Sequence, residues 1–331
     1  QRVLMTRLPI VALSWNIMHA RDAARAKKYF YCSREALSYG YRMKLMAQQI
    51  LTLDPDVLLL QEVETTSLRD ILRCLDAAQR PMAVAASALV DKISSKDGVA
   101  VLVRKSRFDV IHRSTIRFAD HVGTDLPGVV GPAPFLPNLR HKENHAVVTT
   151  VVEKETQRRL HVCSVRLYWD PVVPEIKLAQ AFLFAKALQR YTDAATAATG
   201  AEAPVLIGAD LNSTPSSAVY ELLQGREVPP THAEHPCSVH GRVGLDGVPV
   251  LQLDKREAFQ SAYERVLGEE PEYTNFTATF RGTLDYILMR GLKAEGVAPL
   301  PKEDVLKRHV ALPSVECPSD HLPLLAEVSW V

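Results

Sequence analysis

The sequence predicts an α/β fold in which two mixed β-sheets pack face to face and helices cover their outer sides. Runs rich in Val, Ile and Leu, typical of buried strands, recur along all 331 residues. Helical patterns separate only some of these runs, so the chain is not a simple parallel series of alternating strands and helices. The predicted strands are Pro9–Met18, Asp56–Gln61, Gly98–Val103, His145–Val152, Leu160–Leu167, Pro204–Gly208, Leu284–Met289 and Leu322–Val328.

Three helices are predicted between the strands. Ser67–Asp70 has the form of a capping box and begins a stretch with apolar residues at helical spacing. A second helix is predicted over Pro174–Tyr191. A short third helix is predicted to begin at Thr214, with Pro215 at its first position.

Two segments, Asp120–Asn144 and Glu227–Asp254, show no clear periodicity and are predicted to be loops. Candidate functional motifs continue on both sides of each loop. We therefore expect a single catalytic domain over residues 1–331 rather than two domains.

The composition is that of an ordinary globular protein, with 47% hydrophobic and 23% charged residues. No apolar run reaches the ~18 residues of a membrane span, so no membrane association is expected. The net charge of +1 is low for a general nucleic-acid coat. A polynucleotide substrate would instead be held locally, over a few nucleotides at an active-site groove.

The five cysteines are odd in number and show no metal-ligand spacing, which favours free thiols in a reducing compartment. We expect a cytoplasmic protein. A mitochondrial location is the alternative, because the chain begins at Gln1 and a targeting segment could precede it.

Five short segments end predicted strands with amide, carboxylate or imidazole groups. Groups of this kind, converging from distant strands, are typical of a hydrolytic site with a divalent cation. The segments are Ser14–Ile17, Leu60–Glu64, Gly208–Ser213, Gly282–Tyr286 and Pro318–His321.

The individual residues allow more than one interpretation. Glu62, ending an apolar strand, must be exposed or paired, and an ordinary salt bridge would satisfy it. Asp210 and Asn212 point the same way on an extended segment, and a helix N-terminus following them would attract phosphate. A strand–turn–helix junction with capping residues is the simpler alternative.

These motifs together resemble the endonuclease/exonuclease/phosphatase superfamily, and most closely its deadenylase branch, which includes the carbon catabolite repression nuclease of the Not complex, nocturnin and Angel. The resemblance runs from about Val11 to Trp330. It is carried by Ser14–Met18, Asp56–Glu64 and Asp210–Pro215, and by the branch-specific segments Leu167–Pro171 and Tyr273–Thr277. It implies a four-layer α/β/β/α sandwich.

The resemblance also implies roles for the metal-site residues. Glu62 is the expected principal ligand of Mg²⁺, for which Mn²⁺ can substitute, and Asp320 is a possible ligand of a second ion. Glu64 lacks a family counterpart and is expected to be structural. Asn16 is expected behind the metal and the attacking water.

The remaining catalytic roles follow from the same resemblance. Asp210 is expected to orient or deprotonate the attacking water, and Asn212 to donate a hydrogen bond to the phosphate. Asp285 is expected to accept a hydrogen bond from His321 and thereby to fix its tautomer. His321 would then stabilise the charge that develops on the scissile phosphate.

The residues expected to bind the substrate match the family pattern less completely than the metal-site residues do. Arg166 stands where the branch has His, and it is expected to clamp a substrate phosphate, although it cannot exchange a proton near neutral pH. Phe280 and Pro171 are expected to form two walls of a base slot, with a further polar contact from Asn275. Because stacking accepts every base, adenine selectivity would need hydrogen bonds that the sequence does not reveal.

The expected activity is Mg²⁺-dependent 3′-to-5′ exoribonuclease action on a single-stranded RNA 3′ end, most simply removal of poly(A) with release of 5′-AMP. Two alternatives share the fold, namely a uridine-preferring tail-trimming exonuclease in an organelle and a nocturnin-like phosphatase acting on NADPH. A catalytically silent scaffold is an alternative of a different class, favoured only by Arg166. The sequence does not identify a protein-complex partner.

Overall fold

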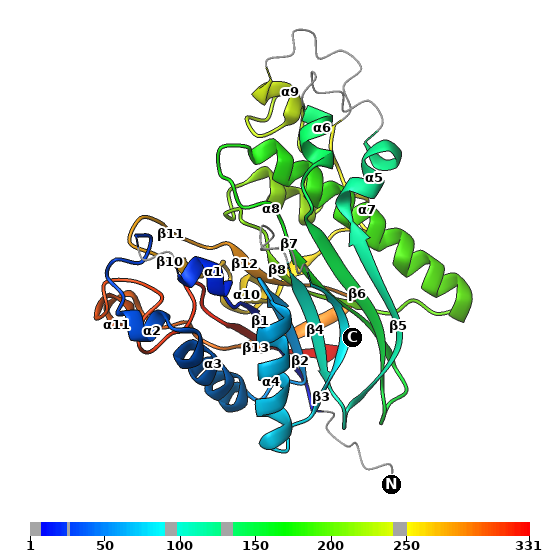
Figure 1. Ribbon diagram of the computed structural model, residues 1–331. Coiled ribbons are helices and arrows are strands. Elements are labelled where there is room, and N and C mark those ends of the chain that lie inside the picture. Colours follow the sequence, from blue (N-terminus) through cyan, green and yellow to red (C-terminus); the bar gives the residue numbers. More distant parts are fainter. Residues whose placement is uncertain (1–7, 25–26, 90–97, 127–134, 241–249) are drawn as a thin grey trace.

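The computed structural model describes residues 8–24, 27–89, 98–126, 135–240 and 250–331. Two six-stranded mixed sheets pack face to face with helices outside them, which confirms the predicted fold class (Figure 1). A separate two-stranded sheet pairs β10 (Asn275–Phe276) with β11 (Arg281–Gly282). Within the described ranges, no helix has the length and apolarity needed to cross a membrane.

The first sheet has the strand order β13–β14–β1–β2–β4–β3. Its strands are β1 (Ile10–Asn16), β2 (Val57–Gln61), β3 (Met82–Ala88), β4 (Val99–Arg104), β13 (Leu292–Val297) and β14 (Leu324–Trp330). The second sheet has the order β5–β6–β7–β8–β12–β9. Its strands are β5 (Phe108–Arg117), β6 (His145–Glu153), β7 (Arg159–Arg166), β8 (Val205–Asp210), β9 (Gln260–Ser261) and β12 (Asp285–Arg290).

Each sheet has one parallel pair at its centre, β1 with β2 in the first and β7 with β8 in the second. The carboxyl ends of two parallel strands lie at the same sheet edge, so the polar residues that end these strands are brought together. The other strand pairs are antiparallel.

Three apolar clusters hold the layers. In β2, Leu59 packs between the sheets with Leu206 and Ile287, whereas Leu58 and Leu60 face helices on the outer side. A strand buried on both faces has no polar alternation, which explains its continuous apolar run. The third cluster lies between the second sheet and its own helices.

The outer helices of the first sheet are α3 (Tyr39–Leu53) and α4 (Thr65–Ala77), and α7 (Pro174–Thr199) crosses the outer face of the second (Figure 1). The other helices are α1 (Ala20–Ala23), α2 (Arg34–Leu37), α5 (Phe118–Asp125), α6 (Phe135–Arg140), α8 (Ala218–Leu223), α9 (Pro236–Val239), α10 (Ala262–Leu267) and α11 (Glu303–Lys307).

Gly208 sets a close approach between the sheets. A Cβ atom there would lie 2.5 Å from Leu59 Cβ and 2.7 Å from Ser14 Oγ, distances that no side chain could accommodate without backbone movement. Polar contacts cross the same gap, because Gln61 Nε2 donates to Ser164 Oγ at 3.1 Å. The two sheets are therefore tightly joined just below the strand ends that carry Asp210 and Glu62.

Several predicted helix boundaries were wrong. Helix α4 begins at Thr65, because Glu64 is the N-cap and Ser67 completes its capping box. Helix α7 continues past Tyr191 to Thr199, and the helix predicted at Thr214 begins only at Ala218, with the Ser217 side chain as its cap. The predicted loops contain α5, α6 and α9, while residues 127–134 and 241–249 within them lie outside the described residues.

Candidate active site

Three polar side chains meet on neighbouring strands of the second sheet. Asp210 ends β8, with Arg166 of β7 as its parallel partner and Asp285 of β12 as its antiparallel partner. All three residues are buried, with Asp210 fully enclosed. This register explains how residues far apart in sequence form one group.

Asp210 lies at the centre of the group. Its Oδ2 accepts hydrogen bonds from Asn16 Nδ2 at 2.8 Å and from Arg166 Nε at 3.2 Å. Its Oδ1 accepts from the backbone N–H of Asn212 at 3.0 Å. Burial, together with the neighbouring Asp285 carboxylate, raises the pKa of Asp210 above its ordinary value, even though His321, Arg166 and Asn16 favour the charged form.

Glu62 follows β2 in a left-handed backbone conformation, with φ of 55°. This conformation is uncommon for a residue with a side chain. Its Oε2 accepts from the backbone N–H of His19 at 2.8 Å, and its Oε1 lies 2.7 Å from Arg166 Nη2. Burial alone would raise the pKa of Glu62, but Arg166 and the His19 N–H hold it below the ordinary value.

His321 and Asp285 form the expected pair. His321 Nδ1 lies 2.8 Å from Asp285 Oδ2, and both side chains are buried. Burial opposes a charged ring, but the Asp285 carboxylate, aided by Asp210 and Asp320, raises the pKa of His321 to about 10. The ring is therefore a cation near neutral pH.

A network that the sequence did not reveal fixes the loop carrying His321. Trp15 Nε1 donates to the His321 carbonyl at 2.9 Å, and Ser319 Oγ donates to the Asn16 carbonyl at 2.7 Å. Arg42 of α3, fully buried, donates to the carbonyls of Pro318 at 2.7 Å and Ile17 at 2.6 Å. Backbone carbonyls carry no sequence signal, so these anchors could not be predicted.

Asp320 faces the same cavity from the loop. Its Oδ2 accepts from Tyr29 Oη at 2.7 Å and from Lys28 Nζ at 3.2 Å. Burial favours the neutral acid, but Lys28 and His321 hold the pKa of Asp320 below its ordinary value. No sequence motif pointed to Tyr29 or Lys28.

Asn212, at φ of 46°, donates from Nδ2 to the Leu167 carbonyl at 2.9 Å. An amide nitrogen carries two hydrogens, so one remains for a ligand. The helix expected directly after it begins only at Ala218, so no helix N-terminus adjoins this residue. Glu64 caps α4 and pairs with His19, consistent with its expected structural role.

A cavity of about 370 Å³ opens above these groups. The lining includes the polar residues Glu62, Arg166, Asn212, Asp320 and His321, and also Asn275, Trp169 and Phe280. Trp169 and Phe280 are 55% and 41% exposed, which leaves aromatic surface available to a ligand. Pro171 is exposed and is not among the residues that line this cavity, whereas Trp169 and Phe280 are.

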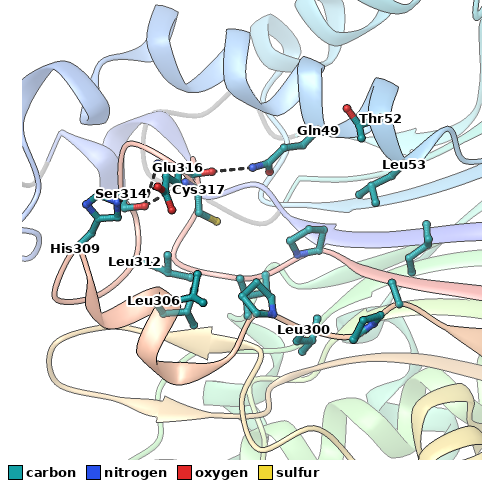
Figure 2. Close-up of a pocket in the computed structure, with 17 residues that line it drawn as sticks. Gln49, Thr52, Leu53, Leu300, Leu306, His309, Leu312, Ser314, Glu316 and Cys317 are labelled. Atoms are coloured by element: carbon teal, nitrogen blue, oxygen red, sulfur yellow. Dashed lines mark hydrogen bonds and ion pairs between the residues drawn. The ribbon is translucent and has the colours of Figure 1, made fainter.

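A second cavity of about 360 Å³ lies behind the His321 loop, between the C-terminal end of α3 and the segment around α11 (Figure 2). Leu53, Leu300, Leu306 and Leu312 represent its largely apolar lining. The polar residues of the lining include Gln49, whose Nε2 donates to the Glu316 carbonyl at 2.9 Å (Figure 2). The cavity lined by carboxylates is therefore the better candidate for hydrolytic chemistry.

Four buried carboxylates in or next to the catalytic cavity could supply oxygen ligands to a divalent cation, namely Glu62, Asp210, Asp285 and Asp320. Possible ligand atoms of Asp210, Asp285 and His321 all lie within 4.8 Å of one another. A ring that Asp285 keeps protonated does not bind a cation, so the carboxylates are the candidate ligands. Asp285 Oδ1 is buried and has no hydrogen-bond partner among the described residues. Carboxylate oxygens are the donors that hard cations prefer.

Sequence comparison gives a family match over most of the chain. The Endonuclease/Exonuclease/phosphatase family matches residues 13–321. Human 2′,5′-phosphodiesterase 12 is 29% identical, over 97% of this chain and 52% of the relative. The CCR4-Not complex 3′-5′-exoribonuclease subunit Ccr4 of Mycosarcoma maydis is 26% identical, over 95% of this chain and 49% of the relative. The chain thus spans about half the length of these curated relatives.

Solved structures agree on the fold. ANGEL2, a 2′,3′-cyclic phosphatase crystallised with adenosine-2′,3′-vanadate, superposes with a TM-score of 0.75 at 21% identity, covering 98% of this chain and 96% of that chain. The human nocturnin catalytic domain superposes with a TM-score of 0.61 at 21% identity, covering 98% and 95%. With its sequence match from the first sheet to His321, this chain belongs to the endonuclease/exonuclease/phosphatase family, and its distant relatives include the deadenylase branch.

Proposed function

We propose that this chain is a Mg²⁺-dependent 3′-to-5′ exoribonuclease that hydrolyses the phosphodiester bonds of a single-stranded RNA 3′ end, with poly(A) as the preferred substrate and 5′-AMP as the product. The observation that carries the proposal is Asp210, a fully buried carboxylate close to the His321 imidazole, the Arg166 guanidinium and the Asn16 amide. Such a carboxylate suits the activation of a water molecule beside a phosphate.

Asp210 would orient the attacking water and accept its proton. Its raised pKa makes it a better base than an ordinary aspartate, while Asn16 fixes the orientation of its Oδ2. Glu62, with Asp320 as the candidate ligand of a second ion, would hold Mg²⁺ or Mn²⁺, which polarises the phosphate and acidifies bound water.

Charge on the phosphate would be stabilised from the cavity wall. His321, kept protonated by Asp285, presents a cation, and Asn212 retains an amide hydrogen. Donors fixed in place before the reaction lower the barrier, because they need no reorganisation when charge develops.

The terminal base would occupy the outer part of the cavity. Phe280 and Trp169 offer exposed aromatic faces there, and Asn275 offers an amide. Stacking on aromatic faces binds single-stranded nucleic acid without a duplex. The earlier pairing of Phe280 with Pro171 is replaced in this proposal by Phe280 with Trp169.

A second candidate is hydrolysis of 2′,5′-phosphodiester bonds in an oligonucleotide. It is favoured by the similarity to human 2′,5′-phosphodiesterase 12, the relative with 29% identity. Either linkage places a nucleoside at the reacting end, so the same base slot would serve both substrates.

The test is a set of labelled substrates incubated with Mg²⁺ or with chelator. It compares oligo(A), oligo(U), mixed RNA and 2′,5′-linked oligoadenylate, with phosphate release from NADPH measured alongside. We expect successive loss of 3′ nucleotides from oligo(A) only with metal present. Internal cuts alone, or undiminished activity in excess chelator, would refute the proposal, and faster turnover of another substrate would replace poly(A) by that substrate.

A further inference from the structure

Arg166 stands out among the residues of the cavity because it bridges two carboxylates with different expected roles. Its Nη2 lies 2.7 Å from Glu62 Oε1, and its Nε lies 3.2 Å from Asp210 Oδ2. The Arg166 side chain is only 5% exposed, and the side chains of Glu62 and Asp210 are 8% and 0% exposed. Ion pairs so far from water are weakly screened and geometrically fixed.

Both oxygens of Glu62 are already engaged. Oε2 accepts from the backbone N–H of His19, and Oε1 accepts from the guanidinium of Arg166. A divalent cation bound to Oε1 would lie close to the guanidinium, and two cations at that separation repel strongly in a buried site. The cation and Arg166 therefore compete for the same oxygen.

Asp320, the other candidate ligand, is held differently. Its cationic partner Lys28 is 48% exposed, so water can replace that contact at little cost. Water cannot replace the contacts of Arg166 in the same way, because its side chain is almost fully buried. Displacing it from Glu62 requires another anion within reach of its guanidinium.

We propose that Arg166 is an internal counter-ion that competes with the divalent cation for Glu62 and is released when its guanidinium binds the substrate phosphate. Phosphate oxygens match a guanidinium in two parallel hydrogen bonds, so they can replace a carboxylate as its partner. Cation and phosphate then bind cooperatively, because each removes the obstacle to the other. The inference rests on the proposed function in taking Glu62 as a metal ligand.

Mn²⁺ binding, followed by electron paramagnetic resonance and by calorimetry, tests the competition without any turnover. Arg166→Ala should bind Mn²⁺ at least about 10-fold more tightly than the wild type in the absence of nucleotide. Arg166→Lys should fall between them, since one ammonium keeps the charge but cannot span both carboxylates in the same way. Adding 5′-AMP should tighten Mn²⁺ binding by a larger factor in the wild type than in Arg166→Ala.

The matched control is Arg107→Ala. Arg107 also bridges two carboxylates, with Nη1 2.6 Å from Asp56 Oδ2 and Nη2 2.8 Å from Glu153 Oε1, but outside the catalytic cavity. Its removal changes the net charge equally and should leave Mn²⁺ affinity unchanged. A comparable gain in this control would show a general charge effect and would overturn the role of Arg166.

Two further outcomes separate this inference from the proposed function. Equal Mn²⁺ affinity in wild type and in both Arg166 variants would overturn the competition while leaving a metal-dependent nuclease intact. Mn²⁺ binding by none of them, with melting curves that show folded protein, would overturn both. If Arg166→Ala melts below the assay temperature without metal, Arg166→Lys carries the comparison.

Discussion

Asp210 and Asp285 are directly opposite partners on the antiparallel strands β8 and β12, so two buried carboxylates share one end of the second sheet. Two like charges at neighbouring buried positions disfavour each other unless cations lie between or beside them. His321 provides one such cation at Asp285, and Arg166 provides another at Asp210.

Replacing either central acid should abolish turnover while leaving the fold intact. Glu62→Ala and Asp210→Ala are each expected to lower kcat by on the order of 10³-fold, because they remove transition-state stabilisation worth several kcal/mol. Turnover on oligo(A) and thermal melting are the measurements. Asp56→Asn is the control, since Asp56 is a carboxylate paired with Arg104 and Arg107 outside the cavity and should affect melting rather than kcat. Near-normal rates in both acid variants would rule out the proposed site.

His321→Ala and Asp285→Asn should behave as one mechanistic unit. Asp285 acts through the His321 ring that it orients. In a protein that already lacks His321, replacing Asp285 should therefore cause little further loss of activity. We expect the double variant to lose far less than the product of the two single losses, measured as kcat/KM on one substrate. Fully multiplicative losses would show that the two residues act independently.

The charge on His321 gives a pH dependence with a definite sign. A histidine whose pKa rises from an ordinary value near ~6.5 to about 10 stabilises the fold fully below ~6.5, and this stabilisation is lost as pH rises through 10. In protein freed of metal by chelator, ring ¹⁵N shifts of His321 should therefore report a protonated imidazole at pH 8. Asp285→Asn should move the midpoint downward, and a wild-type midpoint below pH 7 would contradict the interpretation.

Phe280→Ala should weaken binding of the 3′-terminal base by about 1–3 kcal/mol, the usual worth of one base–aromatic stack. Purines stack over a larger area, so the loss should be greater for oligo(A) than for oligo(U). Specificity constants for both substrates are the measurement, and Trp169→Ala should show the same preference. Phe30→Ala is the control, because Phe30 is 72% exposed and lies outside the lining of the catalytic cavity.

Arg42→Ala should be strongly destabilising although Arg42 is not among the residues that line the catalytic cavity. Its guanidinium donates to the carbonyls of Ile17, Met18 and Pro318, which would be left buried without partners. We expect a loss of about 3 kcal/mol or more in the free energy of unfolding by urea. Arg69→Ala, which removes an arginine side chain that is 55% exposed, should change it by less than about 0.5 kcal/mol.

The strands were predictable because burial on both faces leaves a continuous apolar run. The run Asp56–Gln61 became β2 within one residue, and His145–Val152 became β6 equally closely. Helix starts were less predictable, because several polar residues near a helix start can form the capping hydrogen bond to the backbone. Glu64 and Ser67 both satisfy the chemistry of a cap, and the structure uses Glu64 as the N-cap with Ser67 as its reciprocal partner.

The site residues that end strands could be predicted. Residues that hydrogen-bond to backbone carbonyls, or that pair with carboxylates from both sheets, could not. Asn16, Glu62, Asp210, Asp285 and His321 were all expected at strand ends or in the terminal loop, and the structure brings them to one edge. Arg42 and Trp15 position that edge through carbonyl groups, which every residue possesses. The double engagement of Arg166 depends on the register of β7 with β8, which no local pattern encodes.

The close contact of the two sheets at Gly208 sets how far apart Glu62 and Asp210 lie. Glu62 follows a strand of one sheet and Asp210 ends a strand of the other. At Gly208 the second sheet has no side chain, and its backbone lies directly against the side chains of Leu59 and Ser14 of the first sheet. Protein interiors are nearly incompressible, so this contact acts as a stop that fixes the width of the catalytic cleft. A methyl group added at residue 208 would push the two sheets apart at this contact, and the cleft between Glu62 and Asp210 would widen as the sheets separate.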